Sequence, residues 1–167
     1  LLGDETFDRG EAVKKVGLRI GYLAQHDDWG LADSVEDYLV AKSRKPLWDL
    51  KQLGVGLGVT ERIFSSPMGD LNGGMRMRVK LLALLGSEPD LMLLDEPTNY
   101  LDLESLLVLE NFLQDFKSAF LLISHDREFL RRTTDHILEI ESGEVTKFNG
   151  GLDDYFEQKE SLRLQLE

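Results

Sequence analysis

The stretch LMLLDEPTNYLD, residues 91–102, decides how this chain folds. Four apolar residues, 91–94, run directly into two adjacent carboxylates, Asp95 and Glu96. A continuous apolar run is typical of a strand that is buried on both faces of a parallel sheet. We therefore predict a buried strand over residues 91–94, with both acids at its carboxyl end.

The rest of the sequence places this strand in an alternating order of strands and helices. Polar and turn residues separate the predicted elements, and a helical tail closes the chain. The expected elements are a strand over 17–25, a helix capped at 33–34, a helix opened by Pro46, a helix after the glycines at 73–74, a helix over 102–117, a second buried strand over 119–123, a helix over 127–132, a hairpin of 136–140 with 144–148, and a helix from 152 to 167. This order predicts an α/β fold with a parallel sheet.

Both predicted buried strands end in polar residues. Asp95 and Glu96 follow the first, and Ser124, His125 and Asp126 follow the second. In open α/β sheets, ligands bind beyond the carboxyl ends of the strands. We therefore expect Glu96 and His125 to face one crevice.

Composition restricts the possible functions. The 167 residues carry a net charge of −12, and cysteine is absent, which excludes disulfides and thiolate metal sites. Because such a surface repels phosphate backbones at long range, contacts with nucleic acid are expected to be local or to lie outside this chain. No apolar run reaches the roughly 20 residues that a membrane span needs.

The paired acids suit a magnesium nucleotide. Asp95 can hold Mg²⁺, commonly through water, because this ion keeps much of its hydration shell. Glu96 can polarise a water molecule aimed at a terminal phosphate, and His125 can donate a hydrogen bond to that phosphate. Acidic pairs are common and can simply cap the following helix, but the whole string of residues 91–102 favours the catalytic interpretation.

Three segments together resemble the ATP-binding cassette (ABC) ATPases: LNGGM at 71–75, LMLLDEPTNYLD at 91–102 and LLISHDREFL at 121–130. The forms DEPTN-x-LD and SHDREFL are similar to the ABC-F branch, whose members are soluble, ribosome-associated proteins with two cassettes. The resemblance implies a partial ABC ATPase (P-loop NTPase-like) core with a parallel sheet plus a helical signature subdomain. It divides the chain into a core over 1–25 and 87–150, a helical subdomain over 26–86 and the start of an interdomain linker helix over 151–167.

The resemblance also implies roles for individual residues. Asp95 matches the Walker B aspartate that holds Mg²⁺, Glu96 the catalytic base and His125 the switch histidine. Gln25 matches the Q-loop residue that contacts both Mg²⁺ and the attacking water. The residues implied to contact nucleotide or the opposite cassette are Gln25, the signature residues Asn72, Gly73 and Gly74, and the D-loop acid Asp102.

Two departures from the family pattern bear on activity. No G-x-x-x-x-G-K-[ST] motif occurs, so we interpret the chain as a first cassette lacking its N-terminal Walker A portion. We expect ATP hydrolysis by the intact protein and inactivity of this chain alone. Asn72 and Met75 stand where the family usually has Ser and Gln, which predicts slower turnover at the site they complete.

The expected cofactors are ATP and Mg²⁺, and the expected location is the cytoplasm. The expected partners are a second ABC cassette, in the same chain or in a homodimer-like pair, and the ribosome or its RNA through regions outside this chain, without membrane insertion. One alternative is the nucleotide-binding subunit of an ABC membrane transporter. Another is a non-catalytic module that dimerises without hydrolysis.

Overall fold

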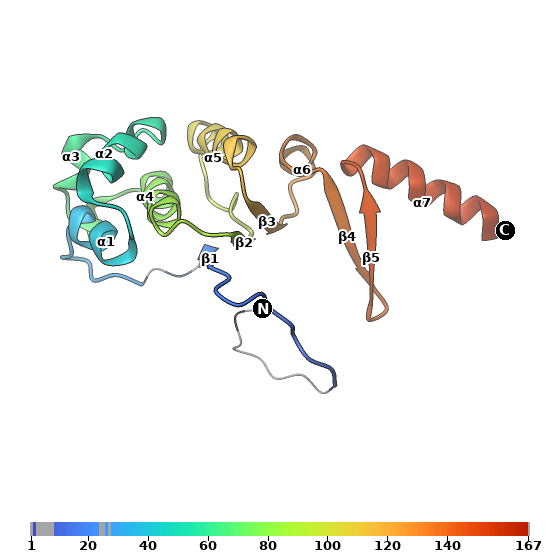
Figure 1. The fold of residues 1–167 in the computed structure, drawn as a ribbon. Helices are drawn as coiled ribbons and strands as arrows, with labels where there is room; N and C mark the ends of the chain where they lie inside the picture. Colours follow the sequence, from blue (N-terminus) through green and yellow to red (C-terminus); the bar gives the residue numbers. More distant parts are fainter. Residues whose placement is uncertain (1, 3–8, 24–25, 27, 167) are drawn as a thin grey trace. The chain divides into compact units, whose positions relative to one another are not determined.

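A computed structural model describes residues 2, 9–23, 26 and 28–166, and Figure 1 shows its ribbon. The chain divides into two compact units, Leu1–Ile123 and Ser124–Glu167. The prediction for Gln25 lies outside the described residues. None of the helices in the described part of the chain combines the length and the apolar character that a membrane crossing requires.

The first unit contains a parallel sheet of three strands, which confirms the predicted α/β class. The strands are β1 (Ile20–Leu23), β2 (Leu91–Asp95) and β3 (Ala119–Ile123), in the spatial order β1-β2-β3. Leu94 of β2 is in register with Leu23 of β1 and Leu122 of β3. Parallel neighbours require long crossovers, and here helices supply both. The crossover from β2 to β3 is α5 (Leu103–Asp115).

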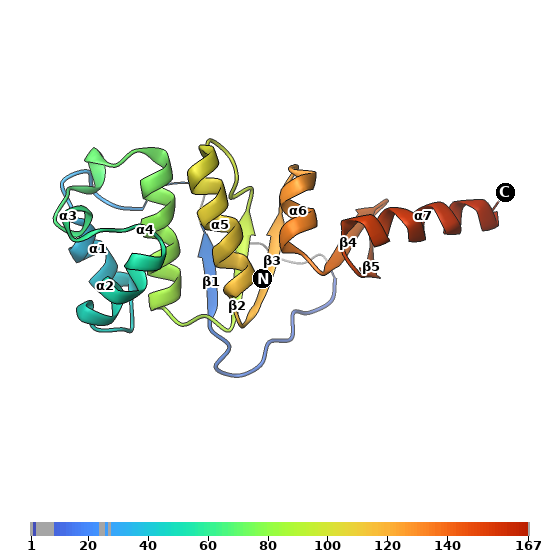
Figure 2. The same cartoon turned by 90° about the horizontal axis from the view of Figure 1, so that it is seen from above.

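One face of the sheet is buried at β2 and half-buried at β3, and the other face is more exposed. Met92 and Leu94 are 0% and 2% exposed, whereas Leu121 and Ile123 are 37% and 58% exposed. Figures 1 and 2 show α4 (Gly73–Gly86) and α5 on the same side of the strands, and alternate side chains of a strand point to opposite faces. Leu91 and Leu93 on the other face of β2 are half-buried, so the prediction that residues 91–94 are buried on both faces is wrong, as is the prediction that 119–123 is a buried strand.

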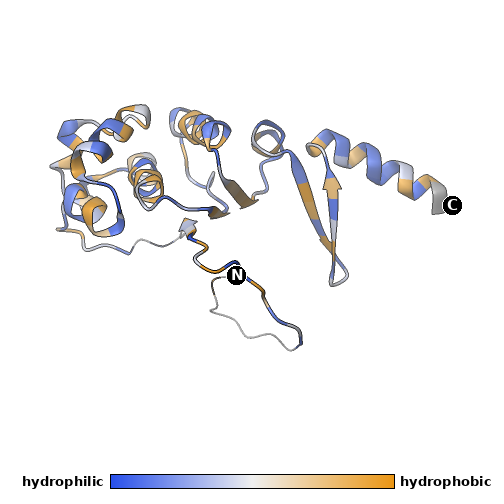
Figure 3. Cartoon of the chain, in the orientation of Figure 1, coloured by the Kyte–Doolittle hydropathy of each residue, from blue (hydrophilic) through white to orange (hydrophobic). Residues whose placement is uncertain are grey.

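A helical segment connects β1 to β2. It comprises α1 (Val35–Lys42), α2 (Leu47–Gly56), α3 (Glu61–Phe64), the short 3₁₀ helix η1 (Met68–Asp70) and α4. The predicted cap of α1 is confirmed, because the Ser34 hydroxyl accepts the Asp37 N–H at 3.0 Å. Polar and apolar residues both occur along these helices (Figure 3), and the apolar ones supply a core in which Leu39, Leu50, Val79 and Leu82 are 0% exposed. The sequence pattern did not predict α3 and η1.

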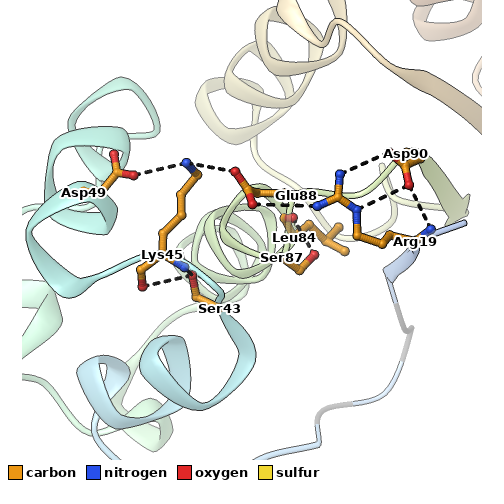
Figure 4. Close-up of polar contacts among 8 residues, drawn as sticks. All are labelled: Arg19, Ser43, Lys45, Asp49, Leu84, Ser87, Glu88 and Asp90. Carbon is orange, nitrogen blue, oxygen red and sulfur yellow. Dashed lines mark hydrogen bonds and ion pairs between the residues drawn. The ribbon is translucent and has the colours of Figure 1, made fainter. Parts of the chain in front are cut away.

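Ion pairs join this helical segment to the sheet (Figure 4). Glu88, in the loop before β2, contacts Lys45 Nζ at 3.3 Å and Arg19 Nη1 at 3.8 Å. Lys45 also pairs with Asp49 of α2 at 3.1 Å, and Arg19 Nη2 donates to Asp90 Oδ1 at 3.2 Å. Pairs as exposed as these contribute little one by one. Together these pairs connect the loop before β2 to α2 and to the residue that precedes β1.

The Arg19–Asp90 pair predicts how stability changes with pH. The Arg19 guanidinium, by donating to the carboxylate, lowers the pKa of Asp90. Because the folded-state pKa is the lower one, the pair stabilises the fold above the ordinary Asp pKa of about 3.9 and loses its effect as pH falls through the folded value. Asp90→Asn is therefore expected to lower the melting temperature at pH 7 and to leave it unchanged near pH 2.

Thermal melts of wild type and variant across this pH range check that expectation. Asp70→Asn is the matched control, because Asp70 forms no ion pair in the described part of the chain. If Asp90→Asn lowers the melting temperature equally at pH 7 and at pH 2, the pH dependence does not come from the Arg19–Asp90 pair.

The second unit consists of α6 (Arg127–Thr133), β4 (His136–Glu141), β5 (Glu144–Asn149) and α7 (Leu152–Leu166). The two strands are antiparallel, and positive φ angles at Ser142 (53°) and Gly143 (83°) give the tight turn between them. Helix α7 packs on the hairpin through Tyr155, whose ring meets Phe148 edge-on at 4.9 Å. The predicted hairpin and C-terminal helix are confirmed.

Candidate functional site

The predicted acids stand at the carboxyl end of β2. Asp95 is the last residue of the strand, Glu96 follows it, and both are half-buried. Glu96 adopts a left-handed backbone conformation with φ at 46°, and its N–H donates to the Ile123 carbonyl at 2.8 Å. This conformation is uncommon for a residue with a side chain, and such strain concentrates at functional sites. The turn therefore holds Glu96 in one fixed position at the edge of the sheet.

Asp95 has the features of a ligand for a hydrated cation. Its half-buried carboxylate makes no hydrogen bond or ion pair with any described residue. No group of three or more acids or histidines within the described ranges could hold a metal by itself. Mg²⁺ in nucleotide sites needs only one or two carboxylates, since phosphate oxygens and water complete its shell. Asp95 and Glu96 thus fit a magnesium nucleotide better than a metal bound by protein groups alone.

The start of α4 has the features of an anion site. Asn72 caps the helix, because its Oδ1 accepts the Met75 N–H at 2.8 Å. Asn72 and Gly73 are exposed, and a Cβ added at Gly73 would meet nothing within 4 Å. The positive end of a helix of 14 residues favours a negative ligand. The open approach at Gly73 would let a phosphate reach the backbone N–H groups.

Asp102 lies close to this turn. It caps α5, because its Oδ1 accepts the Ser105 N–H at 2.8 Å. Hydrogen bonding from Ser105 lowers the pKa of Asp102, with a smaller contribution from the charge of Arg78. A Cβ on Gly74 would lie 3.6 Å from Asp102 Oδ1, so the structure brings the signature residues and Asp102 together.

His125 belongs to the second compact unit and Glu96 to the first. His125 is exposed and lies in a turn just before α6. In that turn Asp126 accepts the Phe129 N–H at 3.0 Å, while the Asp126 N–H donates to Ser124 Oγ at 3.1 Å. The turn therefore fixes the backbone on the C-terminal side of His125. That Glu96 and His125 share one crevice stays a prediction.

A cavity of about 500 Å³ lies away from all of these residues. It opens near the amino ends of β2 and β3, next to Asp90 and Ser118, whereas the acids stand at the carboxyl end of β2. Leu53, Leu57, Phe112 and Phe116 supply much of its apolar lining. The sequence alone does not predict this cavity, because side chains of α2, α4 and α5 meet there only in the folded chain.

Comparison with known proteins agrees with the geometry. The family model described as ABC transporter matches residues 1–99, which include helix α4 with the glycines at its start, strand β2 and both acids. This chain belongs to the ABC transporter family. ABC ATPase domains bind ATP, with Mg²⁺ typical of the family, hydrolyse it, and work as dimers or with a second cassette.

Individual relatives of this ABC domain include two curated proteins. It is 29% identical over 203 residues to the putative ATP-binding protein YdiF of Bacillus subtilis, an alignment that covers 95% of this chain and 32% of YdiF. It is 36% identical over 143 residues to the probable ATP-binding cassette sub-family F member 3 homolog of Encephalitozoon cuniculi, which covers 86% of this chain and 24% of that protein. The chain thus spans a third or less of these curated relatives.

A solved structure shows the same fold. It is an inward-facing conformation of a putative metal-chelate type ABC transporter, matched with a TM-score of 0.69 and 22% identity over 81% of this chain and 59% of that one. At this identity the match establishes the fold of the ABC domain and nothing about its substrate.

Proposed function

We propose that this chain is an ATPase cassette of an ABC-F protein, in which ATP hydrolysis is coupled to an action on the ribosome. The observation that carries the ATPase part is the end of β2, where a carboxylate without a partner among the described residues precedes a second carboxylate in a strained, fixed turn. Membership of the ABC transporter family indicates ATP as the nucleotide. The two acids are the carboxylates that binding of Mg²⁺ and activation of water require.

Each predicted site residue has one task in this proposal. Asp95, with Gln25, holds Mg²⁺, which in the bound nucleotide neutralises charge on the phosphates. Glu96 orients a water molecule and accepts its proton. His125 donates a hydrogen bond to the terminal phosphate. Asn72, Gly73 and Gly74 offer backbone N–H groups to the nucleotide of a second cassette, and Asp102 contacts that cassette.

The ABC-F assignment rests on two kinds of support. The first is the form of the motifs, DEPTN-x-LD at 95–102 and SHDREFL at 124–130. The second is the relative named as a sub-family F member, which is 36% identical over 86% of this chain. Action in the cytoplasm and at the ribosome follows from that assignment.

Co-sedimentation tests the proposal. The protein that contains the chain is mixed with ribosomes or with membrane vesicles, in the presence of a non-hydrolysable ATP analogue or ADP. We expect the protein to pellet with ribosomes when the ATP analogue is present and to remain in the supernatant when ADP is present. We also expect ribosomes to stimulate its ATPase activity.

Two outcomes would contradict the proposal. Binding to vesicles but not to ribosomes would favour a transporter subunit. Analogue-dependent association of two cassettes without any hydrolysis would favour a non-catalytic module.

A further inference from the structure

Polar contacts of Arg78 join the second turn of α4 to the first turn of α5, and they have no part in the proposed chemistry. Of the described residues, three polar or charged ones are buried, and two of these, Arg78 (8% exposed) and Ser105 (3%), meet here. Arg78 Nη2 donates to Glu104 Oε1 at 2.9 Å and lies 3.4 Å from Ser105 Oγ. Removing a guanidinium from water is unfavourable unless several contacts compensate it. Its burial at this position therefore indicates a specific role.

The two signature glycines have different surroundings. A Cβ added at Gly73 would meet nothing, whereas a Cβ at Gly74 would lie 2.3 Å from Ser105 Oγ and 3.2 Å from Ser105 Cβ. Neither glycine has a positive φ angle, so backbone conformation does not explain Gly74. Gly74 is required because the Ser105 side chain of α5 occupies the space that a Cβ would take.

Arg78 also contacts a third element. A Cβ on Gly58, just after α2, would lie 2.6 Å from Arg78 Nη1. The guanidinium thus reaches from the end of α2 to the start of α5. A planar group with five donors can contact both sides at once, whereas the single ammonium of lysine cannot. The arrangement favours arginine at this position for its shape as well as its charge.

We propose that Gly74, Arg78 and Ser105 form a positioning clamp, which locks the first two turns of α4 to the first turn of α5. The clamp presents Asn72 and Gly73 together with Asp102 to a second cassette as one rigid surface. This inference rests on the proposed function, in which the starts of both helices face the other cassette. Arg78 and Ser105 are positioning residues, because they contact neither nucleotide nor water in that scheme.

Hydrogen exchange in three variants of the protein that contains the chain tests the clamp. The readout is the exchange rate of two amides: the Ser105 N–H, which donates to Asp102 Oδ1, and the Leu106 N–H, which donates to the Asp102 carbonyl. Gly74→Ala forces the two turns apart, so we expect these amides to exchange about tenfold faster. Gly73→Ala, the matched control, is expected to leave them unchanged. Adding Ser105→Ala to Gly74→Ala removes the hydroxyl and is expected to restore slow exchange.

The same variants separate positioning from direct contact with phosphate. If Gly74→Ala acts through the clamp, the double variant also recovers kcat for ATP hydrolysis. Unchanged exchange in Gly74→Ala, or no recovery of exchange in the double variant, would overturn the clamp. Recovered exchange without recovered kcat would overturn its role in presenting the surface. If the wild-type protein hydrolyses no ATP, the proposed function fails, while the exchange results still decide whether the clamp exists.

Discussion

Glu96→Gln is expected to slow ATP hydrolysis by about 10²–10⁴-fold, the range that a general base contributes. The amide keeps the size and shape of the side chain but cannot accept the proton of the attacking water. Because Glu96 is half-buried in a turn fixed by its own N–H bond to the Ile123 carbonyl at 2.8 Å, the variant should retain the fold. Single-turnover hydrolysis by the protein that contains the chain, with ATP binding measured in parallel, checks both parts.

The matched control is Glu144→Gln, which makes the same chemical change on an exposed residue of the β4–β5 hairpin. We expect the control to hydrolyse ATP at the wild-type rate. The assignment of Glu96 fails if its variant turns over within threefold of the control. Loss of ATP binding in proportion to turnover would instead assign Glu96 to holding the nucleotide.

Local signals in the sequence predicted local structure well. Asn72 and Asp102 each accept an N–H from three residues further along the chain, at 2.8 Å in both cases. Short polar side chains favour such positions whatever surrounds them. The turn at Ser142 and Gly143 is equally local, because its shape depends on those two residues. The starts of the helices that bear the proposed site could therefore be predicted.

Features that depend on distant residues could not be predicted. An apolar run such as residues 119–123 indicates a strand, but it does not indicate whether helices cover one face or both. Arg78 and Ser105 lie 27 positions apart in the sequence, and nothing local marks either residue as buried. The requirement for Gly74 likewise arises from the Ser105 side chain of α5. The sequence indicated the groups for the chemistry but not the contacts that hold them in place.

The left-handed conformation of Glu96 was also absent from the sequence prediction. Glutamate has no preference for positive φ, so the surrounding structure must impose it. The Glu96 N–H bond to the Ile123 carbonyl continues the pairing of β2 with β3, whose last register pair is Asp95 with Ile123. The position of the proposed base therefore depends on how well the central strand is packed.

Leu94→Ala tests that dependence and is expected to reduce the free energy of unfolding by about 2–5 kcal/mol. Leu94 is 2% exposed and lies between Leu23 and Leu122 in the register of the sheet, so truncation leaves a cavity directly before Asp95. Urea denaturation measures the loss, with Leu31→Ala as the control, since Leu31 is 72% exposed and its truncation should change stability by less than about 0.5 kcal/mol. Equal losses in both variants would refute the assigned core. If packing of β2 positions Glu96, Leu94→Ala also lowers kcat under conditions where the protein remains folded, although the substituted side chain has no part in the proposed chemistry.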